Sequence, residues 1–200
     1  MASSQSSDRN PTFMVIDIRN TLRQSSRVLL RSPQADDECE FTALARSSRR
    51  FFAGLIAPPS DAAAFAAYLR RNTAATFEAL LLIRREDQTI LGAVNLSEIV
   101  RGVFQNAYMG YWTGAPFARQ GYMREGLALS LDHAFSSLRL YRLEANIQPA
   151  NTASVGLVES LGFRREGFSP RYLKIGGRWR DHERWAILSE DWKRLRSPRK

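Results

Sequence analysis

The sequence predicts a mixed α/β domain in which helices cover the faces of one β-sheet. Stretches rich in β-forming residues alternate with stretches whose apolar residues follow helical spacing, and this order favours a sheet flanked by helices. The chain has 200 residues, of which 44% are hydrophobic. It is therefore long enough to bury one sizeable core. No internal repeat or linker divides it, so a single domain is expected.

The first part of the domain is expected to contain one strand and two helices. Val28–Arg31 is a short β-rich run, which we interpret as the first strand. Residues 34–50 and 60–71 have helical character, and the pair Pro58-Pro59 separates them. Ser60 follows directly and is a suitable N-cap for the second helix.

Three strands and a long helix are expected next. Residues 77–84 and 90–99 are β-rich and are joined by a polar turn, which predicts a hairpin. Residues 107–112 add a third strand to this series. Between residues 123 and 138 the apolar positions fall at helical spacing, and residues 140–147 then alternate as a strand does.

A helix and a hairpin complete the domain. Residues 152–161 carry apolar residues at intervals of three, and Gly162 lies where a helix C-cap belongs. Residues 172–175 and 179–188 flank Gly176-Gly177, a hairpin turn signal. The sequence thus predicts about seven strands and about four helices, between a flexible leader (1–26) and a basic tail (191–200), with the domain proper at 27–190.

The charge and the cysteine content limit the classes of function. Lysine and arginine number 29 against 20 acidic residues, which gives a net charge of +9 and a pI near 10.4. This balance favours acidic partners such as nucleotides, RNA or an acidic surface, although a solvated basic surface is the alternative. Cys39 is the single cysteine, so an internal disulfide or cysteine metal cluster is excluded. With two histidines, no metal is expected.

No segment is expected to cross or enter a membrane. The most apolar stretches are too short to span a bilayer, and the N-terminus lacks the long apolar region of a secretory signal. A cytoplasmic location is therefore predicted by default.

The segment with the strongest chemical signal runs from a strand through a glycine-containing loop into a helix. The N–H groups that begin a helix are free to bind an anion, and Gly121 would let a diphosphate approach the main chain closely. Arg119 and Arg124 add positive charge nearby. A plain turn is the alternative interpretation. A second helix begins with Asn151 and Ser154, which suit either capping or ligand binding.

Four stretches, taken in order, resemble a known family. They are Arg101-Gly102-Val103-Phe104 with Ala107-Tyr108-Met109-Gly110-Tyr111; Gln120-Gly121-Tyr122-Met123; Pro149-Ala150-Asn151 through Leu161-Gly162-Phe163; and Glu166-Gly167 followed by residues 172–182. From about residue 28 to 188 the chain resembles the GNAT N-acetyltransferases, and more narrowly the RimJ-type ribosomal-protein-alanine N-acetyltransferases. The resemblance implies a mostly antiparallel mixed sheet in which two neighbouring parallel strands splay apart in a V.

The same resemblance implies acetyl-CoA as co-substrate and a set of binding residues. Main-chain amides of the loop would hold the CoA pyrophosphate, and the pantetheine arm would lie along the strand that ends near Tyr111 and Trp112. Asn151 would contact CoA at the start of the next helix, with Ser154 beside it. The residues of the loop are Arg119, Gln120, Gly121, Tyr122, Met123 and Arg124.

Three positions depart from the family pattern. Met123 stands where the loop pattern has its second small residue, although the RimJ-type branch commonly carries Met there and main-chain amides can serve regardless. Ala118 stands where the loop pattern begins with Gln or Arg. Val158 stands where many members carry the tyrosine that protonates the departing thiolate, and valine cannot do acid chemistry. We therefore assign this role to Ser154, one turn earlier, with Tyr111 and Tyr172 as alternatives.

The reaction makes modest demands on a base if the acceptor is an α-amine. The pKa of a protein α-amino group is about 7.7–8.0, so about a tenth is neutral near pH 7. Glu98 is the candidate general base, and a surface carboxylate is the alternative interpretation. A base that acts through ordered water would also suffice. A main-chain N–H near residues 110–112 would stabilise the oxyanion. Trp112, Trp179 and Trp185 could line an acceptor cleft or pack in the core, and His182 is interpreted as structural.

The expected function is acetylation of the N-terminal alanine of a ribosomal protein by a monomer or homodimer, with possible proximity to the ribosome or rRNA. A GNAT that acetylates a small amine, either a polyamine or an aminoglycoside, is the first alternative. A polycationic acceptor would favour an acidic cleft, however, and this chain is basic. A non-catalytic acyl-CoA-binding or RNA-binding module is the second alternative.

Overall fold

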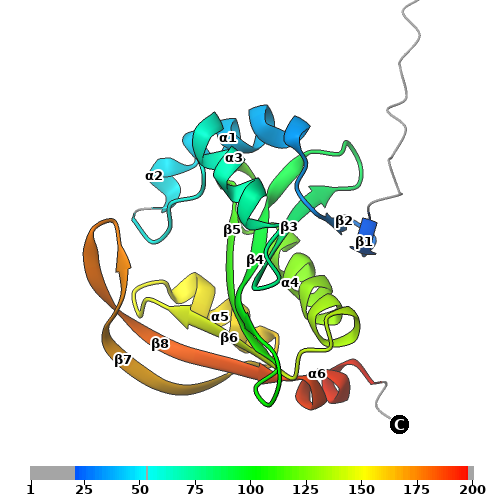
Figure 1. Cartoon of the computed structure of the whole chain (residues 1–200), viewed down its shortest axis with the longest axis vertical. Helices are drawn as coiled ribbons and strands as arrows, with labels where there is room; N and C mark the ends of the chain where they lie inside the picture. The colour runs from blue at the N-terminus through cyan, green and yellow to red at the C-terminus, as the bar shows by residue number, and fades with distance from the viewer. Residues whose placement is uncertain (1–20, 53, 198–200) are drawn as a thin grey trace, which may run out of the picture.

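A twisted eight-stranded sheet forms the centre of the computed structural model, which describes residues 21–52 and 54–197 (Figure 1). The strands are β1 (Thr21–Gln24), β2 (Val28–Arg31), β3 (Phe77–Arg84), β4 (Ile90–Val100), β5 (Asn106–Thr113), β6 (Arg142–Ile147), β7 (Arg164–Ile175) and β8 (Arg178–Leu188). The helices are α1 (Glu38–Ser47), α2 (Arg49–Phe52), α3 (Ala62–Arg71), α4 (Tyr122–Asp132), α5 (Thr152–Ser160) and α6 (Ser189–Arg196). Short helical turns precede α1 (Ala35–Asp37), precede α4 (Ala115–Phe117) and extend α4 (His133–Ser137).

One pair of strands in the sheet is parallel. The strand order is β1-β2-β3-β4-β5-β6-β8-β7, and all neighbours are antiparallel except β5 and β6. The ladder between these two strands ends at the pair Tyr108–Glu144. Beyond that pair β5 continues to Thr113 beside β4, and β6 continues to Ile147 beside β8, but the two strands no longer pair with each other. This confirms the predicted V-shaped splay and the predicted fold class.

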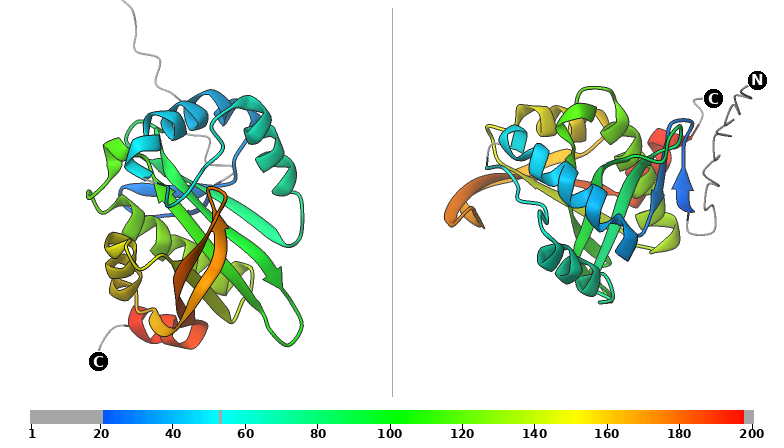
Figure 2. Two further views of the ribbon diagram at one scale, coloured as in Figure 1. Left: turned by 90° about the vertical axis from the view of Figure 1, so that its left-hand side faces the viewer. Right: turned by 90° about the horizontal axis from the view of Figure 1, so that it is seen from above.

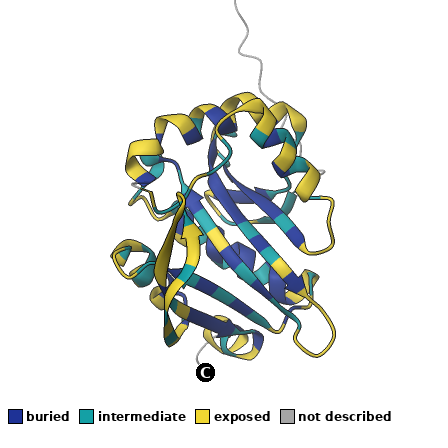
Figure 3. Ribbon diagram, turned by 60° about the vertical axis from the view of Figure 1, so that its left-hand side comes forward, coloured by how far each residue is buried: buried dark blue, intermediate teal, exposed yellow. Residues whose placement is uncertain are grey.

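Helices cover both faces of the sheet (Figure 2). Leu127 and Leu131 of α4, Val158 of α5 and Trp192 of α6 are buried in one core with the strands. A second core on the opposite face contains α1, α2 and α3 with Trp112 of β5. Strands β2, β3 and β4 are largely buried between these layers, whereas most of β7, the start of β8 and the outer faces of the helices are exposed (Figure 3).

Aromatic packing attaches α1 and α3 to the middle of the sheet. The ring centroid of Phe41 in α1 lies 5.0 Å from that of Phe65 in α3 and 5.2 Å from that of Trp112 in β5. The Phe41–Trp112 pair is edge-to-face, a geometry that the ring quadrupoles favour. The position of β5 is therefore coupled to the helices that cover it.

Both ends of the domain carry structure that the sequence did not predict. Thr21–Gln24, within the expected leader, pairs with β2 as an additional strand because Leu22 packs against the core. The expected basic tail begins as helix α6, since Trp192 is buried and its Nε1 donates a hydrogen bond to Asp132 at 2.7 Å. Residues 1–20 and 198–200 lie outside the described residues.

Other element boundaries differ from the expectation for local reasons. The helix expected at 34–50 divides at Ser48, whose buried hydroxyl accepts the N–H of Ala115 at 2.9 Å. Asp61, not Ser60, caps α3 by accepting the N–H of Ala64 at 2.8 Å. The strand expected at 172–175 is the end of the longer β7, whose pairing with β8 is irregular. None of the helices within residues 21–52 and 54–197 has the length and apolar character that a bilayer crossing requires.

The first prediction concerns Gly92, where β4 lies against β5. A Cβ at this position would lie 2.1 Å from the backbone oxygen of Trp112. Because backbone must move to relieve this contact, Gly92→Ala should lower the free energy of unfolding by about 3 kcal/mol, in the range of overpacked or strained sites. Urea denaturation measures this change.

Gly156 provides the matched control. It lies inside α5, is exposed, and has no heavy atom within 4 Å of the place that a Cβ would occupy. Gly156→Ala should stabilise the protein by about 0.5–1 kcal/mol, because alanine is the better helix former. Equal effects of the two substitutions would contradict the close approach of β4 and β5 at Gly92.

Candidate functional site

Three neighbouring cavities lie around the splayed end of β5. The loop cavity, of about 420 Å³, lies between the segment before α4, the start of α5 and the residue pairs 51–52 and 55–56. The aromatic cleft, of about 470 Å³, lies on the other face of the sheet beside α3. The strand gap, of about 90 Å³, lies between the diverging ends of β5 and β6. Tyr111 and Ile56 line all three, so the cavities meet at one point.

Most of the predicted binding residues line the loop cavity. They are Tyr111, Trp112, Arg119, Gly121, Met123, Arg124, Asn151 and Ser154. Gln120 does not line it, and its side chain donates to the carbonyl of Pro116 at 2.7 Å. The ring of Tyr122 is also directed elsewhere, under the guanidinium of Arg27 at 4.9 Å. These two residues can therefore contribute to the loop cavity only through the main chain.

The backbone of the loop is shaped to present N–H groups to the cavity. Gly121 is the N-cap of α4 with φ +83°, a left-handed conformation that glycine adopts without strain. Arg119 is also left-handed, with φ +61°. The first N–H groups of α4 have no intrahelical acceptor, and the helix dipole adds partial positive charge there. Together with the charges of Arg119 and Arg124, this arrangement suits a diphosphate.

Tyr111 and Ser154 form a hydrogen-bonded pair at the junction of the cavities. The Tyr111 hydroxyl lies 2.5 Å from Ser154 Oγ. Asn151 fixes the start of α5 by accepting the N–H of Ser154 at 3.2 Å. Burial raises the pKa of Tyr111 to about 12, and the hydrogen bond with Ser154 opposes part of this rise. The tyrosine is therefore protonated at neutral pH and can donate a proton.

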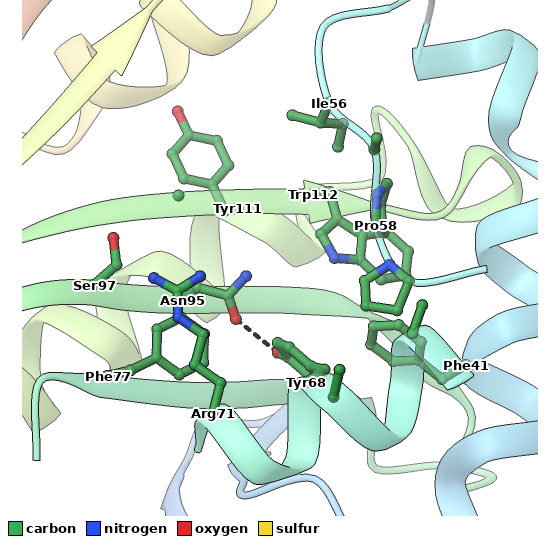
Figure 4. Close-up of a pocket in the computed structure, with 15 residues that line it drawn as sticks. Phe41, Ile56, Pro58, Tyr68, Arg71, Phe77, Asn95, Ser97, Tyr111 and Trp112 are labelled. Carbon is green, nitrogen blue, oxygen red and sulfur yellow. Dashed lines mark hydrogen bonds between the residues drawn. The ribbon is translucent and has the colours of Figure 1, made fainter. Parts of the chain in front are cut away.

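The aromatic cleft is walled by neutral side chains from α1, α3, β4 and β5 (Figure 4). The Tyr68 hydroxyl donates to Asn95 Oδ1 at 2.6 Å, and burial raises the pKa of Tyr68 well above its usual range. Of the described residues that line the cleft, Arg71 alone is charged. Its guanidinium lies 4.2 Å above the ring of Phe77, which provides a cation–π contact.

The remaining candidates lie apart from this junction. Glu98 lies at a β-bulge with φ +50°, and its 67% exposed side chain pairs with Arg71 at 3.5 Å. It lines none of the three cavities. Trp112 is a wall of both the loop cavity and the aromatic cleft, whereas Trp179 is 61% exposed and Trp185 packs in the core. The side chain of Tyr172 lies beside His182 and lines none of the three cavities.

Several site residues were not predicted from the sequence. Leu55 and Ile56, in the segment between α2 and α3, line the loop cavity and the strand gap. Asn146 and His182 line the strand gap. The proline pair that follows Ile56 indicated a non-helical segment, but no sequence signal placed that segment against β5.

Comparisons with known proteins agree with this geometry. Residues 27–164 match the acetyltransferase (GNAT) domain family. The chain is 36% identical over 107 residues to the [ribosomal protein uS5]-alanine N-acetyltransferase of Escherichia coli (strain K12), an alignment that covers 54% of this chain and 55% of that protein. The chain thus spans little more than half the length of the curated relatives that it matches.

Solved structures match a larger part of the chain. Mycobacterium smegmatis RimJ in complex with CoA-disulfide superposes with a TM-score of 0.75 at 26% identity, covering 82% of both chains. Spermidine N-acetyltransferase from Vibrio cholerae in complex with CoA and spermine superposes with a TM-score of 0.73 at 20% identity, covering 84% of this chain and 99% of that one. At that identity the second likeness concerns the fold alone.

Proposed function

Since the chain belongs to the GNAT acetyltransferase family, we propose that it transfers the acetyl group of acetyl-CoA to the N-terminal α-amine of a protein. We propose the N-terminal alanine of a ribosomal protein as the acceptor. The resemblance to the Escherichia coli uS5-alanine enzyme supports this choice. The net charge of +9 would favour encounter with an acceptor near rRNA.

The loop cavity fits the co-substrate. The N–H groups at the start of α4, with Arg119 and Arg124, would hold the pyrophosphate of acetyl-CoA. The pantetheine arm would follow β5 toward Tyr111. At that point the backbone edge of β5 that no longer pairs with β6 faces the strand gap. Acetyl-CoA supplies an activated acyl group as a thioester, so the chain itself must position the amine and transfer protons.

The charge of the aromatic cleft is the observation that carries the choice of acceptor. A polyamine holds several positive charges and requires acidic groups to bind them, but the charged residue that lines this cleft is Arg71. Since Arg71 is paired with Glu98 and no carboxylate is among the described residues that line the cleft, the cleft offers nothing to neutralise a polycation, whereas a peptide with a single terminal amine needs less compensation. The cleft opens onto Tyr111 and Trp112, next to the co-substrate.

Tyr111 and Ser154 would protonate the departing thiolate. The raised pKa keeps the Tyr111 hydroxyl protonated at neutral pH, and the Ser154 hydroxyl lies within hydrogen-bond distance of it. Either group can deliver its proton and be reprotonated by the other. The pair would thus replace the tyrosine that the family pattern places at the position of Val158.

The second prediction tests the acceptor. With acetyl-CoA, the protein should acetylate a synthetic peptide that begins with a free alanine, and should leave spermidine and an Nα-blocked lysine peptide unmodified. Peptides of the same sequence that begin with Ser or Met provide the comparison. Mass spectrometry locates the added acetyl group, and transfer to spermidine without transfer to the Ala peptide would overturn the proposal.

The third prediction concerns Gly121. A side chain here would occupy a left-handed backbone position and lie 3.1 Å from Arg27 Nη2. Gly121→Ala should weaken CoA binding about tenfold, equal to about 1.4 kcal/mol, because the loop amides lose their alignment. Isothermal titration calorimetry measures the Kd, with Gly156→Ala as the control that leaves CoA affinity unchanged.

The fourth prediction concerns the Tyr111–Ser154 pair. Tyr111→Phe and Ser154→Ala should each lower kcat about 100-fold, in the range of general acid catalysis, with a smaller change in the KM for acetyl-CoA. The kcat of the double variant should be only slightly lower than that of the more impaired single variant, because the two hydroxyls act as one unit. Steady-state kinetics measures these values, and losses that multiply would show that the hydroxyls act independently.

A further inference from the structure

The strand gap is lined by two polar side chains, Asn146 and His182, to which the proposed function gives no role. The Tyr111–Ser154 pair would supply a proton to the thiolate, but no group has yet been assigned to accept the proton of the amine. On one side the gap is lined by Gly110 and Tyr111 of β5, and on the other by Asn146 of β6 and His182 of β8. The gap exists because β5 and β6 stop pairing after Tyr108 and Glu144. It therefore lies at the point where the loop cavity and the aromatic cleft meet.

Asn146 and His182 point to the same face of the sheet as the aromatic cleft. Along β6, Ala145 and Ile147 are buried in the core beneath α4 and α5, so the alternation of the strand turns Asn146 to the opposite face. Asn146 pairs with Arg184 of β8, and His182 lies two residues from that partner. Both side chains therefore approach the gap from the side on which an acceptor would enter.

The hydrogen bonds of His182 determine which ring nitrogen holds the proton. Nδ1 lies 2.9 Å from the backbone oxygen of Arg180. A carbonyl oxygen only accepts, so Nδ1 must be the donor, and in the neutral ring Nε2 then carries a free lone pair. Tyr172 packs against the imidazole with 6.2 Å between ring centroids, and His182 is only 3% exposed. The ring is thus fixed with a basic nitrogen available.

Asn146 supplies a second acceptor. Its Oδ1 is buried and has no hydrogen-bond partner within the part of the chain that the structure describes. Buried polar atoms are almost always paired, so an orphan that lines a cavity indicates a donor from a ligand. Apart from His182, the described residues that line the gap have no ionisable side chain other than the tyrosine Tyr111. The gap thus offers the Asn146 amide oxygen and His182 Nε2, with no carboxylate among its described residues, to a group rich in N–H donors.

We propose that the acceptor amine meets the acetyl group at the strand gap, where Asn146 Oδ1 accepts one N–H of the amine and His182 Nε2 removes its proton. This inference rests on the proposed amine acetylation, but it does not depend on which amine is the acceptor. The amine nitrogen forms a bond to the acetyl carbon, and the bond from that carbon to sulfur breaks. The amine proton passes to Nε2, and the thiolate takes a proton from the Tyr111–Ser154 pair.

Nitrogen NMR tests the tautomer in the free protein. The chain has two histidines, so ¹⁵N-histidine labelling gives two ring systems, and the spectrum of His182→Gln assigns them. At pH 8 we expect the His182 ring with its proton on Nδ1. We also expect its Nε2 resonance to shift when CoA and an amine-bearing peptide are added together. A ring protonated on Nε2, or an Nε2 resonance that a saturating acceptor leaves unchanged, would overturn the proposal.

Two substitutions of His182 separate basicity from structure. His182→Asn can still donate to the Arg180 carbonyl, and His182→Gln places an amide near Nε2, but neither side chain is a base. Both should keep the melting temperature within a few degrees and the KM for acetyl-CoA within about twofold. We expect kcat to fall about 100-fold with an α-amine acceptor.

The same variants are then assayed with an aminooxyacetyl peptide, whose nucleophile is uncharged at pH 7. The loss should shrink to less than about tenfold, since less proton removal is required before attack. A purely structural role would reduce both reactions by the same factor and would overturn the assignment of the base. If the wild-type protein acetylates none of the peptides, the proposed function fails, whereas the NMR measurement still tests the subsite.

Asn146→Val tests the second acceptor. Valine suits a strand and removes the buried orphan oxygen, so the melting temperature should stay equal or rise. The KM for the acceptor should nevertheless increase about tenfold while the KM for acetyl-CoA remains unchanged. An unchanged acceptor KM in this folded variant would contradict the role of Asn146.

Discussion

The early end of the ladder between β5 and β6 is the constraint on which the site depends. Three residue pairs join these parallel strands, and the last is Tyr108–Glu144. Beyond it, β5 pairs with β4 alone, so the backbone groups on its other edge are left without a strand partner. Backbone polar groups inside a protein require partners. An interruption in the middle of a sheet is therefore a place prepared for a ligand, and all three cavities open onto it.

Two consecutive residues of β5 connect the two halves of the site. Because side chains alternate along a strand, Tyr111 faces the core beneath α4 and α5, whereas Trp112 faces the aromatic cluster beneath α1 and α3. Tyr111 contacts α5 through Ser154, and Trp112 contacts α1 through Phe41. Each helical layer thus packs against one face of the same strand, and the loop cavity and the aromatic cleft share these two residues as walls.

Local signals predicted the features that depend on local structure. The loop around Gly121 and the cap at Asn151 could be inferred because helix starts have characteristic residues and geometry. The roles of Asn146 and His182 could not be inferred from the sequence. They depend on the pairing of β6 with β8, which lie about 40 residues apart in the chain, and on the place where the ladder between β5 and β6 ends. The position of Glu98 agrees with the alternative of a surface carboxylate, because the bulge in β4 turns it outward to Arg71, and periodicity does not reveal a bulge.

The distribution of charge around the cavities also bears on which class of amine the proposed function would use, an α-amine or a polyamine. Cations lie beside the loop cavity, where phosphates would bind, whereas the described residues that line the strand gap include the Asn146 amide and the His182 imidazole and no carboxylate. A site without carboxylates gains little from a permanent ammonium, so it favours amines that lose their proton readily. About a tenth of an α-amine with a pKa of 7.7–8.0 is neutral near pH 7, whereas an amine with a pKa near 10.4 is neutral in well under about 0.1% of molecules. In the proposed function, the gap and the cleft therefore act in the same direction, because the described residues that line them include no carboxylate of the kind that a polyamine requires.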